Sequence, residues 1–112
     1  MAKHPDDRDL FPGALEIMIL KSLRLKPMHG YALVKHIKQV SDNLLQVEEG
    51  SLYPALQRMW IKGWVLAKRG TTAGDRRARY YRATELGRKQ LSLEVSQFEP
   101  VMGAITRVIQ TA

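Results

Sequence analysis

One pair of strand-like segments interrupts a chain whose other patterned stretches have helical spacing. Residues 64–69 and 77–83 have strand character, and the stretch 70–75 between them is rich in Gly and Thr. Strand-like runs around a short flexible loop are typical of a β-hairpin. The sequence therefore predicts a mainly α-helical fold with one small β-hairpin, placed late in the chain.

Apolar spacing predicts two helices in the first part of the chain. The first covers about 14–23 and carries two apolar stripes, of which the second contains Ile17 and Leu20 and needs a cover of its own. A turn at 26–30 is expected to separate it from a second helix over 31–40. The residues expected to face inward in the second helix are Leu33, Val34, Ile37 and Val40.

A third helix is predicted after the segment 44–47, which is either a single strand or a tight crossing. Ser51 is the expected N-cap, and Pro54 then lies in the first turn, where a backbone N–H has no helical partner to lose. Gly63 is the expected end of this helix. The residues expected to face the core are Leu52, Ala55, Leu56 and Met59.

The last predicted helix begins at Thr84, a good N-cap, and runs to the end of the chain. Its apolar residues repeat at spacings of four and three, as in the seam of a coiled coil. This seam packs either on the body of the same domain or on a partner helix, and we expect a partner helix because a short domain has little body left to cover it. Pro100 is expected to kink the helix or to start a new segment.

Positive charge is concentrated around the hairpin. The chain of 112 residues has a net charge of +7, yet residues 1–56 are balanced and the excess lies in 57–112. Within 57–89 the only acidic residues are Asp75 and Glu85. The basic residues of the same stretch are Arg58, Lys62, Lys68, Arg69, Arg76, Arg77, Arg79, Arg82, Arg88 and Lys89. A charge so one-sided predicts a surface for nucleic acid rather than an ordinary solvated face.

Several classes of protein are excluded on composition. The chain has no Cys, which removes disulfides, thiolate nucleophiles and Cys-based metal sites. The three His are scattered, and no catalytic arrangement or phosphate loop is visible, so we expect no metal, no cofactor and no enzyme activity. No apolar run is long enough for a membrane span, and the polar start, expected to be a flexible arm over 1–11, is not a secretory signal. We expect a cytoplasmic protein.

The order helix, helix, helix, basic hairpin, helix is typical of a winged helix-turn-helix. In that fold the third helix enters the major groove with its N-terminal residues at the base edges. The Lys and Arg of the hairpin would neutralise phosphates. We therefore expect a flexible arm at 1–11, a DNA-binding domain at 12–83 and a C-terminal dimerisation helix at 84–112.

Four stretches of the sequence resemble one family. They are Pro27-Met28-His29-Gly30-Tyr31, Gly50 to Arg58 with its Ser-Leu-Tyr-Pro-Ala-Leu block, Gly63-Trp64-Val65, and Arg76 to Thr84 with Gly87 shortly after. In one register over about 12–98 they resemble the PadR-like transcriptional regulators, in the small branch with a single C-terminal helix. The resemblance implies a bacterial DNA-binding regulator, usually a repressor, that dimerises through its C-terminal region. Trp60, Phe98 and Pro100 depart from the usual pattern of the family.

Candidate DNA contacts fall on the predicted second and third helices and on the hairpin. Arg58 suits guanine and Gln57 suits adenine, while a hydroxyl such as that of Tyr53 suits a phosphate. Each of three candidates also has a structural alternative. Tyr31 could instead close the core, Ser51 could cap the third helix, and Tyr53 could wedge between helices. The full set of candidates is Tyr31, Ser51, Tyr53, Pro54, Gln57, Arg58, Lys68, Arg76, Arg77 and Arg79. One of Tyr80 and Tyr81 must face inward, because strand neighbours point to opposite faces.

The expected partners are double-stranded operator DNA and a second copy of the chain. The candidate dimer contacts are Ile17, Leu20, Leu91, Val95, Phe98, Met102, Ile105 and Ile109. Phe98 is expected in the dimer core, and the alternative is an apolar slot for a small planar effector. The function that these features favour is a sequence-specific regulator, a repressor that binds a palindromic operator as a homodimer. The alternatives are a protein-interaction adaptor and a nucleic-acid-binding protein without sequence preference.

Overall fold

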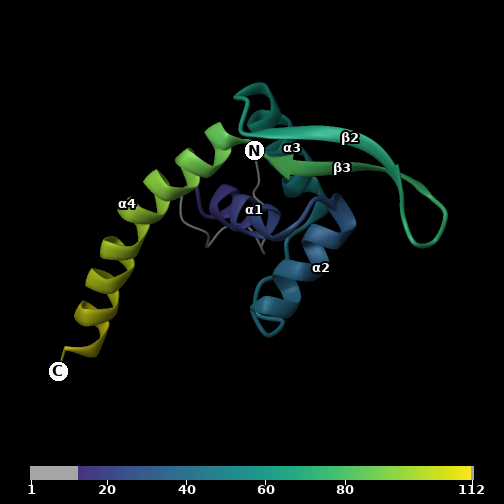
Figure 1. Ribbon diagram of the computed structural model, residues 1–112. Helices are drawn as coiled ribbons and strands as arrows, with labels where there is room; N and C mark the ends of the chain where they lie inside the picture. Colours follow the sequence, from purple (N-terminus) through teal and green to yellow (C-terminus); the bar gives the residue numbers. More distant parts are fainter. Residues whose placement is uncertain (1–12, 112) are drawn as a thin grey trace.

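The computed structural model describes residues 13–111, which form four helices and a small antiparallel sheet of three strands whose hairpin projects past the helices (Figure 1). The elements are α1 (Ala14–Leu25), β1 (Met28–His29), α2 (Gly30–Val40), α3 (Glu49–Ile61), β2 (Val65–Thr71), β3 (Arg77–Ala83) and α4 (Glu85–Gln110). The expected mainly α fold with a late hairpin and a C-terminal helix is confirmed. The arm expected at 1–11 lies outside the described residues.

The core lies where α1, α2 and α3 meet the base of the sheet. Its fully buried side chains are Ile19, Leu20, Leu33, Leu52, Leu56, Met59 and Val65. The expected core face of α3 is confirmed, because Leu52, Ala55, Leu56 and Met59 are all buried. The inward placement of Val40 is wrong: it is 70% exposed, because it is the last residue of α2 and the helix end extends past the core.

The turn expected at 26–30 contains a short strand instead. Met28 pairs with Tyr81 and His29 pairs with Tyr80, so that β1 adds to the outer edge of β3 and the strand order is β1-β3-β2. Met28 is 3% exposed, which gives the pairing apolar burial as well as backbone hydrogen bonds. The partner strand lies some 50 residues further along the chain, and local turn signals carry no information about such a pairing.

Helix α3 begins earlier than its sequence suggests. Its N-cap is Glu48, whose carbonyl accepts hydrogen bonds from the N–H groups of Ser51 and Leu52 at 3.0 and 2.9 Å. The capping role expected for Ser51 is therefore wrong. Pro54 lies inside the helix rather than in its first turn, so the carbonyl of Gly50 has no intrahelical donor. The preceding segment 44–47 is an irregular crossing rather than a strand.

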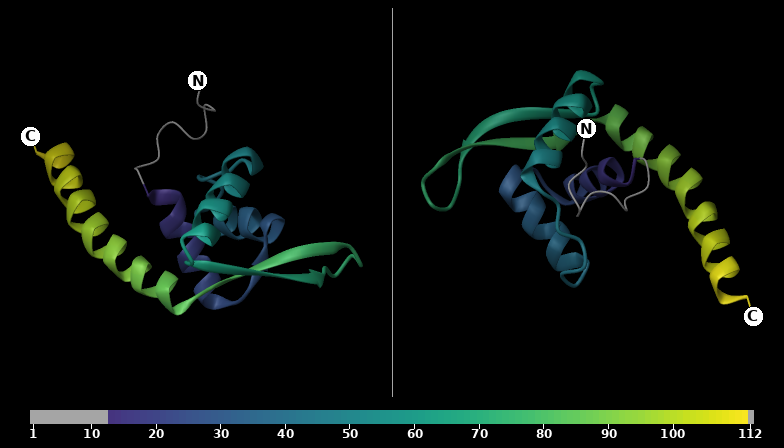
Figure 2. Two further views of the ribbon diagram at one scale, coloured as in Figure 1. Left: turned by 90° about the horizontal axis from the view of Figure 1, so that it is seen from above. Right: turned by 180° about the vertical axis from the view of Figure 1, so that it is seen from behind.

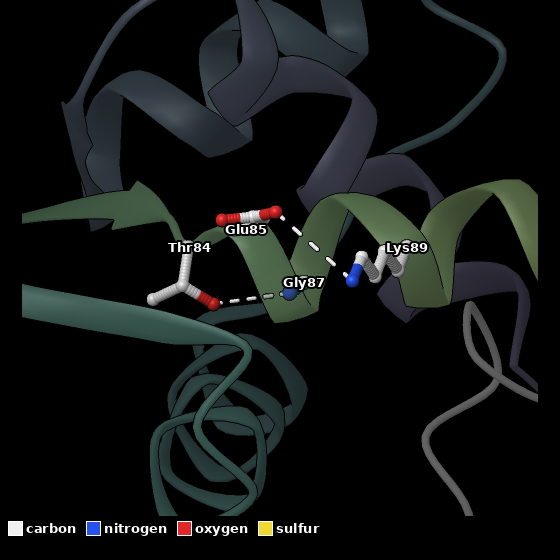
Figure 3. A network of polar contacts seen from close by, with 4 residues as sticks. All are labelled: Thr84, Glu85, Gly87 and Lys89. Atoms are coloured by element: carbon white, nitrogen blue, oxygen red, sulfur yellow. Dashed lines mark hydrogen bonds and ion pairs between the residues drawn. The ribbon is translucent and has the colours of Figure 1, made fainter.

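The ends of the hairpin follow the sequence closely. Gly63 ends α3 with a φ of +80°, a conformation that favours glycine, and β2 begins two residues later. Thr84 Oγ1 accepts a hydrogen bond from Gly87 N at 3.0 Å and starts α4, and Lys89 pairs with Glu85 across the first turn (Figure 3). Both expected helix boundaries are confirmed.

Helix α4 is a single helix of 26 residues that continues through Pro100. The expectation that a new segment starts at Pro100 is therefore wrong. The first half of α4 packs on α1 through Leu91 and Val95. The second half extends away from the body on the side opposite to the tip of the β2–β3 hairpin, as all three views show (Figures 1 and 2).

Candidate nucleic-acid interface

The register of the β2–β3 hairpin sorts its basic residues onto two faces. Arg69 pairs with Arg79 and Thr71 pairs with Arg77, in the same alternating set as the buried pair Val65 and Ala83. Side chains of one set share a face of the sheet. Arg69, Arg77 and Arg79 therefore lie on the face that meets the helices, but further along the hairpin, where the core has ended and all three are exposed.

The other face of the hairpin carries Lys68 and Arg82. Lys68 pairs with Tyr80, and Arg82 pairs with Leu66, which is 42% exposed. The register also resolves the two tyrosines, because Tyr81 is 8% exposed and Tyr80 is not buried. The phenol of Tyr80 donates a hydrogen bond to the carbonyl of Thr71 at 3.2 Å, and its ring lies against Gly70. This contact stiffens the middle of the hairpin.

An open cleft of about 650 Å³ separates the hairpin from the helices. Its walls are the start of α2, one residue of α3, the loop at the hairpin tip and the start of β3. The lining residues are His29, Gly30, Tyr31, Ala32, Lys35, Tyr53, Thr72, Ala73, Gly74, Arg76, Arg77, Ala78 and Arg79. Four of these carry a permanent positive charge and none is acidic, so the cleft is suited to a polyanion.

Tyr53 joins α3 to the start of α2. A methyl group at Gly30 would lie 2.7 Å from Tyr53 Cζ and would also meet the hydroxyl, so only glycine allows the ring this position. Partial burial raises the pKa of Tyr53 above its ordinary value of 10.0, and the charges of Glu49 and Tyr81 add to the rise. The hydroxyl is therefore protonated at neutral pH and able to donate a hydrogen bond to a phosphate oxygen.

An aromatic cluster adjoins the cleft, and two of its rings, those of His29 and Tyr31, line it. The His29 ring stacks on Tyr31 with centroids 6.4 Å apart and meets Tyr80 edge-on at 5.3 Å. His29 also caps α2, because its Nδ1 accepts a hydrogen bond from Ala32 N at 3.2 Å. Lys35 lies one turn after Tyr31, with its Nζ 5.5 Å from the centre of the tyrosine ring. These contacts fix the direction of Tyr31, which is 59% exposed.

The structure brings together half of the residues predicted to contact DNA. Tyr31, Tyr53, Arg76, Arg77 and Arg79 all line the cleft. The outward residues of α3 lie beside it rather than in it. Lys68 points away, on the opposite face of the hairpin.

Arg58 lies on the other flank of α3 and faces α1. Its Nη2 is 3.5 Å from Glu16 Oε2, and its side chain remains 56% exposed. The sequence indicated Arg58, like Gln57, as a candidate base contact and gave it no partner within the chain. The ion pair joins α3 to α1 and directs the guanidinium toward α1.

Sequence reasoning missed two residues of this surface. Lys35 lines the cleft, while His29 caps α2 and holds the aromatic cluster. A signal for Lys35 was present, since it lies one helical turn after Tyr31. Nothing local marked His29, because its role depends on β1 pairing with β3.

Apolar residues on α4 form a second exposed surface. Val101, Ile105, Val108 and Ile109 are 36% exposed or more, and Phe98 and Met102 are half-buried. Two of the candidate dimer contacts are misplaced, because Leu20 is 0% and Leu91 3% exposed and both belong to the core of the single chain. The reason is that the first half of α4 packs back on α1, where Gly87 lies beside Leu20.

Within residues 13–111, no three His, Asp or Glu side chains come close enough to hold a metal ion. None of the described helices combines the length and apolarity that crossing a membrane requires.

Comparison with known proteins gives one family and a consistent set of structures. Residues 19–93 match the model of the transcriptional regulator PadR-like family. An uncharacterized protein of Lysinibacillus sphaericus is 31% identical over 93 residues, which cover 83% of this chain and 85% of that protein.

Solved structures extend the likeness to the whole fold. A transcriptional regulator from Clostridium thermocellum is 26% identical with a TM-score of 0.79, over 88% of this chain and 96% of that chain. A PadR family transcriptional regulator from Eggerthella lenta is 27% identical with a TM-score of 0.72, over 90% and 86%. A PadR-like regulator from Bacillus cereus is 25% identical with a TM-score of 0.75, over 90% and 96%.

Proposed function

Because this chain belongs to the PadR-like family of transcriptional regulators, we propose that it binds a palindromic operator as a homodimer and represses transcription by occluding a promoter. The observation that carries the proposal is the basic cleft between the hairpin and the start of α2. It combines four cations and two tyrosines along one side of the winged helix-turn-helix. Such a group of cations can neutralise phosphates of a duplex.

The contacts in this proposal divide by chemistry. Arg76, Arg77 and Arg79 neutralise phosphates, and the hydroxyls of Tyr31 and Tyr53 donate hydrogen bonds to phosphate oxygens. The first turns of α3 enter the major groove with Ser51, Pro54 and Gln57. Lys68, on the far face of the hairpin, adds only to the general positive field.

A homodimer follows from the apolar surface of α4. Val95, Phe98, Met102, Ile105 and Ile109 repeat at spacings of four and three along one side of the helix. The distal members of this seam project beyond the body of the chain, where a second copy of α4 would cover them (Figure 2). Ile17, half-buried on α1, lines an apolar groove between α1 and α2, so its place in the pairing stays a prediction. In this proposal residues 12–83 bind DNA and residues 84–112 pair the chains.

Phe98 takes an ordinary place in the dimer core in this proposal. The alternative is an apolar slot across the two-fold axis that binds a planar aromatic effector. Titration with planar aromatic compounds, followed by tryptophan fluorescence, separates the two. Saturable binding that disappears in Phe98→Ala would replace the core role with the slot. Absence of binding to the parent chain, or binding that Phe98→Ala leaves unchanged, supports the core role.

Selection of binding sites from a random pool of duplex DNA tests the proposed function. We expect an enriched palindrome with two half-sites about one helical turn apart. Uniform recovery of all sequences would favour a nucleic-acid-binding protein without preference, and no recovery at all would favour a protein-interaction adaptor. Either result contradicts the proposal.

A further inference from the structure

The outward face of α3 is poor in groups that can read a base. The buried residues of α3 lie on one side, and at about 100° per residue the opposite side holds Gly50, Pro54, Gln57 and Ile61. All four are exposed. Gln57 is the only one whose side chain can donate or accept a hydrogen bond. Any hydrogen-bond reading of a base edge by the centre of this face depends on that one amide.

The flanks of α3 are engaged elsewhere. Tyr53 packs over Gly30 at the start of α2, on the side of the cleft. Arg58, on the other flank, is paired with Glu16 of α1 at 3.5 Å. Arginine is the side chain best suited to guanine O6 and N7, and this pair directs the strongest guanine reader of α3 toward α1.

The shape of the face allows a close approach to the groove. The space beside the Cα of Gly50 is open for 4 Å, and Pro54 offers only an apolar ring. Gln57 lies one turn after Tyr53, which borders the basic cleft, so a duplex held by the cleft passes next to the amide.

We propose that α3 selects an A·T base pair in each half-site, with Gln57 bonded to adenine N6 and N7, Pro54 against a thymine methyl, and Arg58 withheld from guanine by Glu16. The pairing chemistry is that of a bidentate amide with adenine and of an apolar group with the C5 methyl of thymine. This assignment rests on the proposed function, because it requires that α3 enter the major groove of DNA.

The test is site selection from a random duplex pool with the full-length chain and two matched variants, Gln57→Ala and Arg58→Ala. For the unaltered chain we expect one position in each half-site with a preference for adenine of about tenfold or more. Gln57→Ala should abolish the preference at that position alone, and affinity for the selected duplex should fall more than affinity for random DNA. Arg58→Ala, one residue away, should leave the selected sequence unchanged.

The outcomes separate this inference from the function on which it rests. If the unaltered chain enriches no sequence, the proposed regulator function fails, and the base assignment fails with it. If it enriches a sequence that Gln57→Ala retains in full, the regulator function stands and the reading by Gln57 is overturned. If the parent chain selects a guanine that Arg58→Ala no longer selects, the claim that Glu16 keeps Arg58 away from guanine is overturned. Circular dichroism of each variant confirms that the fold is retained.

Discussion

The two parts of the molecule that project from the core differ in chemistry. The β2–β3 hairpin and the start of α2 enclose a cleft with four cations and no carboxylate, whereas the second half of α4 presents Val101, Ile105, Val108 and Ile109. A positively charged cleft binds a polyanion most favourably, and an exposed apolar seam is stabilised most by packing against another apolar seam. From this difference we propose separate partners for the two projections, DNA at the cleft and a second copy of the chain at α4.

The largest effect is expected on dimerisation, when a charge is introduced into the exposed apolar seam of α4. Ile105→Glu places a charge in the centre of the proposed seam and should raise the dimer dissociation constant by about a hundredfold, or about 3 kcal/mol, because the carboxylate is buried on pairing. Sedimentation equilibrium measures the constant. Gln110→Glu adds the same charge to an exposed residue about 140° away around the helix, outside the seam, and is the control. An equal loss in both variants, or a monomeric parent chain at micromolar concentration, would contradict the seam.

The joint between α4 and the body gives the next effect. A methyl group at Gly87 would meet the backbone carbonyl oxygen of Trp64 and would lie 3.0 Å from the carbonyl carbon, where nothing flexible can yield. Gly87→Ala should lower the free energy of unfolding by about 2–3 kcal/mol in urea denaturation.

Gly103→Ala is the matched control for that substitution. Gly103 lies in the projecting half of α4, where a methyl group would meet only the end of the Arg107 side chain at 3.4 Å. Alanine in place of a helical glycine should stabilise by about 0.5–1 kcal/mol. Similar destabilisation by both substitutions would show that α4 does not pack on the body as described.

The basic cleft is tested by two arginines of one strand. Arg77→Ala should weaken binding to specific and random DNA alike, about tenfold for each half-site, and should reduce the salt slope by about one for each bound chain. Arg82→Ala removes the same charge from the far face of the hairpin and should have less than a third of that effect. Fluorescence anisotropy between 50 and 200 mM salt, a range in which such slopes are steep, measures both. Equal losses would remove the distinction between the faces.

The smallest expected effect concerns the position of Tyr53. Gly30→Ala displaces the ring from the start of α2 and should lower DNA affinity about fivefold or less, because one neutral hydrogen bond to phosphate is lost. The same substitution in a Tyr53→Ala background should have no further effect on binding. A full effect in that background would mean that Gly30 acts independently of the tyrosine.

Local signals predicted the elements of this fold well. The hairpin, the end of α3 at Gly63 and the cap at Thr84 each depend on residues within a few positions of one another, and all three are confirmed. The start of α3 was missed although it too is local. Its cap is made by the backbone of Glu48 rather than by the side chain of Ser51, and a backbone carbonyl has no sequence signature.

The candidate site was predictable in its chemistry and only partly in its geometry. Charge marked Arg77 and Arg79 as candidates but did not show that Lys68 lies on the other face, which requires the register of the two strands. The pair between Arg58 and Glu16 and the burial of Leu91 depend on how helices pack, across more than 40 residues of sequence in the first case. Such contacts are set by the tertiary fold and leave no periodic pattern.

The division of partners between the two projections is tested most directly by sedimentation velocity with the selected duplex. The parent chain should form a complex of two chains on one duplex. The double variant Arg77→Ala with Arg79→Ala should sediment as a free dimer beside free duplex, and Ile105→Glu should sediment as a monomer at the same concentration. A double variant that becomes monomeric, or an Ile105→Glu chain that remains a dimer, would contradict the division.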